Sequence, residues 1–143
     1  DEEQALGLSR VPFDELIARA DVITLHVPSG KDTRHLIDAA ALGRMKPEAI
    51  VINTARGTII DEPALVRALA ENWIRFAALD VTDPEPLPPD HVLYSLPNCF
   101  ILPHIGSATH GTRKRMAEMA CENLLAGLEG KRLPNCVNPE VYS

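Results

Sequence analysis

Short apolar runs, the first of them rich in β-branched residues, alternate with helical stretches along the chain, and this alternation restricts the possible folds more than any other feature. The runs lie at residues 22–27, 49–52, 76–81 and 99–102. Between them, apolar residues recur three and four positions apart, as on the buried face of a helix. The second run is apolar on both faces, which is typical of parallel strands covered by helices. The sequence therefore predicts an α/β fold with a parallel sheet and covering helices.

Apolar spacing and capping residues also place the expected helices. These cover residues 13–20, 36–45, a stretch that begins after Asp61, and 109–128. Asp61 is a typical helix cap and Pro63 a typical first-turn residue, whereas Gly130 is expected to end the last helix. Residues 8–11 are expected to form a short strand. Residues 83–97 contain five prolines and are expected to form an ordered loop.

Length and composition set limits on function. A chain of 143 residues suits one domain or a large part of one. A net charge of −6 offers no basic surface to nucleic acid, and no apolar run reaches the roughly 18 residues of a membrane span. The cysteines Cys99, Cys121 and Cys136 lack paired spacing, which favours reduced thiols in a cytoplasmic protein. Metal-binding motifs such as Cys-x-x-Cys are absent from the sequence, so no metal is expected.

Three residues of complementary chemistry each follow the end of an expected strand: Arg56, Glu85 and His104. Ligands bind at the carboxyl ends of strands in open parallel sheets, so we expect these side chains to converge. A guanidinium can bind a carboxylate and polarise the neighbouring keto oxygen, and a histidine can supply a proton. A carboxylate held between Pro84 and Pro86 can favour the imidazolium. Together these groups suit the reduction of a keto acid.

Each of these residues also has a structural interpretation when taken alone. Arg56 is compatible with a helix cap or a surface ion pair, His104 with a structural role, and Glu85 with a solvated loop acid. Asp83 is the competing carboxylate in the same loop. Gly57, directly after Arg56, is expected to allow an unusual backbone angle there.

Five blocks, taken in order, resemble the D-isomer-specific 2-hydroxyacid dehydrogenases. The blocks are residues 22–28, 33–37, 53–57, 79–86 and 102–109. The last two are most similar to the glyoxylate/hydroxypyruvate reductase branch. The resemblance implies a partial Rossmann-type sheet and an oxidoreductase that converts a small 2-keto acid to the D-2-hydroxy acid. It further implies that Arg56 holds the substrate carboxylate, His104 is the acid/base, and Glu85 supports His104.

The resemblance also implies a cofactor, NAD or NADP, and a homodimer as the complete enzyme. By the same resemblance, the cofactor-binding residues are Val27, Pro28, Thr33, Thr54, Ala55, Asp80 and Gly106. In this role, the Asp80 carboxylate would accept a hydrogen bond from the cofactor carboxamide.

One departure from the family pattern is large. No Gly-x-Gly-x-x-Gly, the loop that lets a pyrophosphate approach a helix, occurs among the eight glycines. The resemblance then implies that residues 1–143 are the C-terminal part of a dinucleotide-binding domain, with residues 109–128 leading back toward an absent substrate domain. The alternatives are a family member acting on 3-phosphoglycerate or lactate, a non-catalytic dinucleotide-sensing interaction protein on the same fold, and a truncated product without activity.

Overall fold

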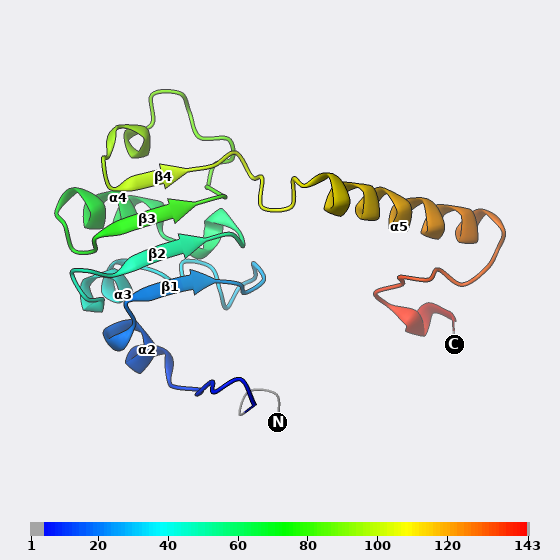
Figure 1. Cartoon of the computed structure of the whole chain (residues 1–143), viewed down its shortest axis with the longest axis horizontal. Coiled ribbons are helices and arrows are strands. Elements are labelled where there is room, and N and C mark those ends of the chain that lie inside the picture. Colours follow the sequence, from blue (N-terminus) through cyan, green and yellow to red (C-terminus); the bar gives the residue numbers. More distant parts are fainter. Residues whose placement is uncertain (1–4, 143) are drawn as a thin grey trace. The chain divides into compact units, whose positions relative to one another are not determined.

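The computed structural model describes residues 5–142. Their contacts divide the chain into two compact units, one ending at His104 and the other beginning at Ile105. The first unit holds the sheet and the second a single long helix (Figure 1).

The sheet of the first unit has four parallel strands in the order β1-β2-β3-β4 (Figure 1). The strands are β1 (Val22–Leu25), β2 (Ile50–Asn53), β3 (Phe76–Leu79) and β4 (Cys99–Ile101). All three neighbouring pairs are parallel and in continuous register. The predicted α/β fold with a parallel sheet is confirmed. Three of the strands end one or two residues earlier than predicted, where the chain turns into loops.

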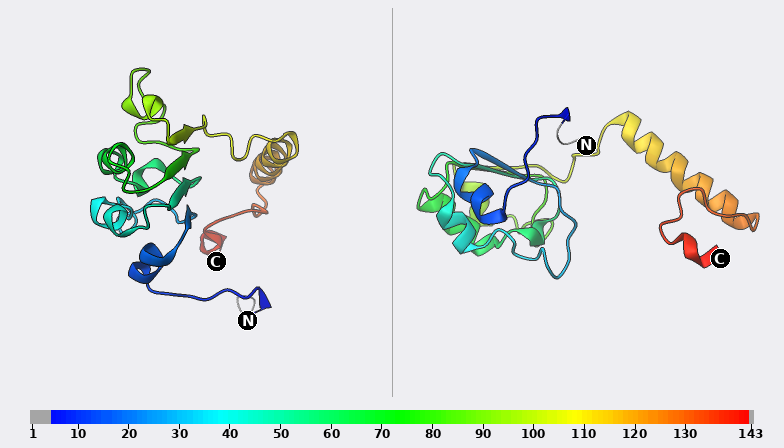
Figure 2. Two further views of the ribbon diagram at one scale, coloured as in Figure 1. Left: turned by 60° about the vertical axis from the view of Figure 1, so that its left-hand side comes forward. Right: turned by 90° about the horizontal axis from the view of Figure 1, so that it is seen from below.

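Three α-helices lie on one face of this sheet (Figure 2). They are α2 (Phe13–Arg19), α3 (Ala39–Arg44) and α4 (Glu62–Ala70), with short 3-10 helices η1 (Gly57–Ile59) and η2 (Val92–Ser95) in the connecting loops. The predicted Asp61 cap is present, since its carboxylate accepts from the Ala64 N–H at 3.3 Å. Helix α3 starts later than predicted because Asp38 caps it and Ile37 pairs with Ile60 instead. The strand predicted at residues 8–11 is wrong: that segment is irregular and exposed.

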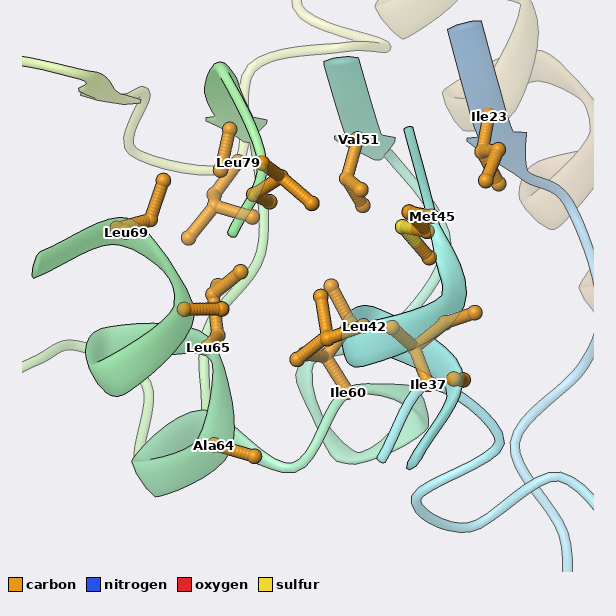
Figure 3. Close-up of a cluster of buried hydrophobic side chains, with 14 of the residues drawn as sticks. Ile23, Ile37, Leu42, Met45, Val51, Ile60, Ala64, Leu65, Leu69 and Leu79 are labelled. Carbon is orange, nitrogen blue, oxygen red and sulfur yellow. The ribbon is translucent and has the colours of Figure 1, made fainter. Parts of the chain in front are cut away.

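The core lies between the helices and the sheet (Figure 3). Ile23, Val51 and Ala77 are adjacent in register, and all three are buried against the helices. Leu42 of α3 and Leu65 of α4 meet them, and each is at most 1% exposed. Full burial of such a side chain stabilises the fold by about 1.5–3 kcal/mol. The covered face therefore anchors the strand ends that carry the candidate site.

The other face of the sheet is covered much less within this unit. Residues 50, 52, 76 and 78 are half-buried, and Phe100 of β4 is 54% exposed. Because β2 is apolar on both faces, the sequence predicted that helices would cover both faces of the sheet. Helices α2, α3 and α4 cover one face only (Figure 2).

The second unit is built on α5 (His110–Leu128), followed by the 3-10 helix η3 (Pro139–Tyr142). The Thr109 hydroxyl caps α5 by accepting from the Thr112 N–H at 3.2 Å. The helix ends before Gly130, which has φ +69°, so the predicted long helix is confirmed. No residue of α5 is buried, and several exposed apolar side chains lie along it: Met116, Leu124, Leu125 and Leu128. Within residues 5–142, no helix has the length and apolar character needed to cross a membrane.

Candidate active site

The three predicted catalytic residues follow the carboxyl ends of three adjacent strands. Arg56 lies three residues after β2, Glu85 six residues after β3, and His104 three residues after β4. Because the strands are parallel, these ends share one edge of the sheet. All three side chains belong to the first unit, whose loops at this edge form the candidate site.

His104 and Glu85 form the central pair of the site. The Nδ1 of His104 lies 2.6 Å from the Glu85 Oε1, so the predicted contact between them is present. The other carboxylate oxygen of Glu85 accepts from the Thr82 N–H at 3.3 Å. A carboxylate accepts, so Nδ1 carries the proton and Nε2 is left to exchange one with a ligand. The side chains of His104 and Glu85 are 47% and 38% exposed, which leaves them accessible.

His104 also adopts an unusual backbone conformation, with φ +54°. The left-handed region is unfavourable for a residue with a Cβ and is enriched at functional sites. From this backbone position, the contact with the Glu85 carboxylate orients the ring.

Arg56 is positioned by its backbone. The side chain of Asn53, 1% exposed at the end of β2, donates to the Arg56 carbonyl at 2.9 Å and accepts from the Ala55 N–H at 3.0 Å. The exposed Arg56 guanidinium donates to the Ala55 carbonyl at 2.6 Å rather than to Glu85 or His104. The structure therefore brings Glu85 and His104 into contact and leaves the Arg56 head group outside that contact. Sequence reasoning missed Asn53, although a polar residue closing an apolar strand was a usable signal.

The loops carrying Arg56 and Glu85 touch through Gly57. A Cβ built on Gly57 would lie 2.0 Å from the Thr82 carbonyl oxygen and 2.6 Å from the Asp83 nitrogen. The φ of Gly57 is not in the left-handed region, so the expected unusual backbone angle is wrong. Glycine is required here by the close approach of two backbones.

A cavity of about 510 Å³ opens beside the His104–Glu85 pair. Besides these two residues, its lining includes Asp80, Thr82 and Tyr94, with apolar side chains completing the wall. Asp80 is buried at 6% exposure directly after β3, and its N–H donates to the Asn53 carbonyl at 2.9 Å. Sequence reasoning missed Thr82 and Tyr94, which become neighbours of the site only through the folding of the proline-rich loop. The cavity is large enough for a small organic acid.

The other predicted cofactor residues lie along the same edge or beyond it. Thr54 and Ala55 follow β2, and Val27 and Pro28 follow β1. Thr33 donates its hydroxyl hydrogen to the Pro28 carbonyl at 2.6 Å. Gly106 lies in the second unit, two residues after His104. The binding roles of all these residues stay predictions.

Neither a metal site nor a reactive thiol is found at this edge among the described residues. Within residues 5–142, no three His, Cys, Asp or Glu side chains gather as a metal site. Cys99, Cys121 and Cys136 are free thiols, and burial raises the pKa of Cys99 to about 11. A thiol with so high a pKa is a poor nucleophile near neutral pH.

The structure thus presents a histidine–carboxylate pair beside a small cavity at the carboxyl ends of parallel strands, the edge at which α/β folds bind ligands. The family model for the D-isomer specific 2-hydroxyacid dehydrogenase NAD binding domain matches residues 1–106. The chain therefore belongs to the D-isomer specific 2-hydroxyacid dehydrogenase family, and the predicted resemblance is confirmed.

Individual relatives agree with this assignment. The chain is 48% identical over 141 residues to a glyoxylate reductase of Korarchaeum cryptofilum, covering 99% of this chain and 42% of that protein. It is 48% identical over 139 residues to the glyoxylate/hydroxypyruvate reductase B of Pectobacterium carotovorum, covering 97% and 43%. The crystal structure of the TT0316 protein from Thermus thermophilus superposes with a TM-score of 0.86 at 54% identity, covering 89% and 40%. The chain thus spans about two fifths of the length of these relatives.

Proposed function

We propose that the full-length protein containing this chain reduces a small 2-keto acid, of the glyoxylate or hydroxypyruvate type, to the D-2-hydroxy acid. The observation that carries the proposal is the 2.6 Å contact between His104 Nδ1 and Glu85 Oε1. It fixes the tautomer of His104 and leaves Nε2 available for proton transfer to the substrate oxygen. Arg56 would bind the substrate carboxylate, for which its planar guanidinium is suited. The names of the relatives support the substrate class.

The cofactor in this proposal is NADH or NADPH, which supplies the hydride when bound. The matched NAD binding domain supports a dinucleotide. Asp80, buried at the end of β3 beside the cavity, would accept from the carboxamide. The backbones of Thr54, Ala55 and Gly106 would line the nicotinamide end. Val27, Pro28 and Thr33 would flank the adenosine end.

We also propose that residues 1–143 form the C-terminal part of the dinucleotide-binding domain. Residues 109–128 would then lead toward a substrate domain. The exposed apolar side chains of α5 support this, because a substrate domain or a second subunit of a homodimer would cover them. The free thiols support a cytoplasmic protein, and the net charge of −6 supports a small-molecule ligand over nucleic acid.

Substitutions in the full-length protein test the proposed roles. His104→Ala should lower kcat by about 10²–10⁴-fold, the usual contribution of a general acid. Arg56→Ala should raise the KM for the keto acid as well as lower kcat. Arg75→Ala is the matched control, since Arg75 precedes β3 at the opposite edge of the sheet and its side chain pairs with Glu48 at 3.5 Å.

The pH dependence gives a second test. Reduction requires the imidazolium form of His104 and should slow as the pH rises, whereas oxidation of the hydroxy acid requires the neutral ring and should accelerate. A His104→Ala enzyme with wild-type kcat, or flat profiles in both directions with chemistry rate-limiting, would refute the mechanism.

A further inference from the structure

A second histidine–carboxylate pair lies in the first unit, between the start of α4 and the C-terminal end of the loop that carries Glu85. The Nε2 of His91 is 2.9 Å from the Glu62 Oε1, and both side chains are only 19% exposed. Glu62 is the first residue of α4, and His91 directly precedes η2. The pair therefore joins a rigid helix of the core to the far end of the loop that carries Glu85.

The hydrogen bonds of His91 fix the direction of this interaction. Its Nδ1 accepts from the Leu93 N–H at 3.4 Å, so the proton of the neutral ring is on Nε2 and is donated to Glu62. The His91 N–H in turn donates to the Pro88 carbonyl at 3.0 Å. His91 is thus tied to the helix, to η2 and to the proline-rich loop at once.

The segment between His91 and Glu85 is stiff. Pro86, Pro88 and Pro89 fix three of its φ angles, and the side chain of Leu87 is buried at 5% exposure. At the other end of the loop, Glu85 bonds to the Thr82 N–H, and Thr82 abuts Gly57. Because this segment has little backbone freedom, a displacement of His91 is expected to move Glu85 as well.

The pair is not explained by stability. Burial raises the pKa of Glu62, and its Oε2 is buried without a hydrogen-bond partner. The charge and the hydrogen bond of His91 each lower this pKa by less than burial raises it, and the negative charge of Asp83 raises it by a still smaller amount. A carboxylate whose pKa is raised on folding is less stable in its charged form inside the protein than in water, so apolar side chains of similar size can be tolerated where both partners of the pair are replaced.

We propose that Glu62 and His91 are positioning residues that hold the 82–91 loop so that the Glu85 carboxylate meets His104. This proposal rests on the proposed function. Neither residue touches the substrate or the cofactor in this role; both act through Glu85.

A double-mutant cycle in the full-length protein tests this. Glu62→Leu should lower kcat about tenfold, because displacing a positioned group by a fraction of an ångström weakens catalysis, while the KM for the keto acid stays within about twofold. Glu62→Gln keeps the acceptor for His91 and should retain kcat within about twofold. Glu85→Gln should lower kcat about 10–100-fold, and adding Glu62→Leu to it should change kcat less than about twofold. Glu48→Gln, which removes the carboxylate paired with Arg75, is the control for loss of a charge.

A merely structural role would give different results. Glu62→Leu would then lower the melting temperature without changing kcat per folded molecule, or its effect would multiply with that of Glu85→Gln; either outcome overturns the proposal. His91→Leu and the double variant Glu62→Leu/His91→Leu repeat the test if Glu62→Leu alone does not fold. If Glu85→Gln itself leaves kcat unchanged, the proposed function fails at Glu85 and the inference falls with it. If Glu85→Gln lowers kcat and Glu62→Leu does not, only the inference fails.

Discussion

Gly57→Ala is a direct test of how the two catalytic loops are held together. The added Cβ would lie 2.0 Å from the Thr82 carbonyl oxygen, 2.1 Å from its carbon and 2.6 Å from the Asp83 nitrogen. Real Cβ atoms essentially never come closer than 3.0 Å to a neighbour, so the oxygen must retreat by about 1 Å. All three atoms belong to the backbone, and no side-chain rotation can relieve the clash. The loop that carries Glu85 must therefore move away from the loop that carries Arg56.

The expected consequences are large for activity and moderate for stability. Overpacking of this kind destabilises a protein by about 1–3 kcal/mol. A misplacement of about 1 Å at a catalytic group can lower the rate about 100-fold, so kcat/KM of the full-length enzyme should fall by about that factor. Steady-state kinetics with glyoxylate and urea unfolding measure the two effects separately.

Gly43→Ala is the matched control. Gly43 lies inside α3, its φ is not positive, and a Cβ there meets nothing within 4 Å. Alanine should therefore raise the free energy of unfolding by about 0.4–1 kcal/mol and leave the kinetics unchanged. Wild-type activity and stability in Gly57→Ala would refute the close contact between the loops.

Three further predictions concern individual features of the chain. At pH 8, a pKa of about 11 leaves about one Cys99 thiol in a thousand ionised. In the isolated 143-residue chain, mass spectrometry should therefore find exposed Cys121 alkylated by iodoacetamide long before Cys99, and equal rates would contradict the burial of Cys99. Asp61→Ala removes the cap of the Ala64 N–H and should lower the free energy of unfolding by about 0.5–2 kcal/mol, as measured with urea; an unchanged midpoint would contradict the cap. The 143-residue chain alone contains no Gly-x-Gly-x-x-Gly loop and should not bind NADPH measurably; micromolar binding by a monomer in a fluorescence titration would contradict this.

The sheet was predictable from the sequence because each strand depends on a local pattern. Each strand is a short apolar run bounded by polar or turn residues, and the Asp61 and Thr109 caps act within one helical turn, so both signals can be read without knowing the tertiary structure. The strand expected at residues 8–11 failed because strands need a pairing partner, which local composition does not reveal.

The site was predictable only as far as strand ends define it. Parallel topology placed Glu85 and His104 at one edge, and their contact followed. The contact of Glu62 with His91 joins residues 29 positions apart and depends on how the proline-rich loop folds. No local sequence pattern therefore predicts it. Gly57 was correctly singled out for the wrong reason, since sequence cannot distinguish a glycine needed for φ from one needed for close approach.

The energetic cost of a positive φ can be measured at His104, because this non-glycine residue occupies the left-handed region, with φ +54°. An alanine in this conformation costs about 1–2 kcal/mol, whereas glycine adopts it freely. Relative to alanine, glycine also lowers the free energy of unfolding by about 0.4–1 kcal/mol, because it gives the unfolded chain more conformational freedom. His104→Gly should therefore be more stable than His104→Ala by about 0.5–1 kcal/mol in urea unfolding, the reverse of the order expected at Gly43. Both variants lack the imidazole and should be equally inactive. An alanine variant as stable as the glycine variant would mean that the backbone of His104 is not strained.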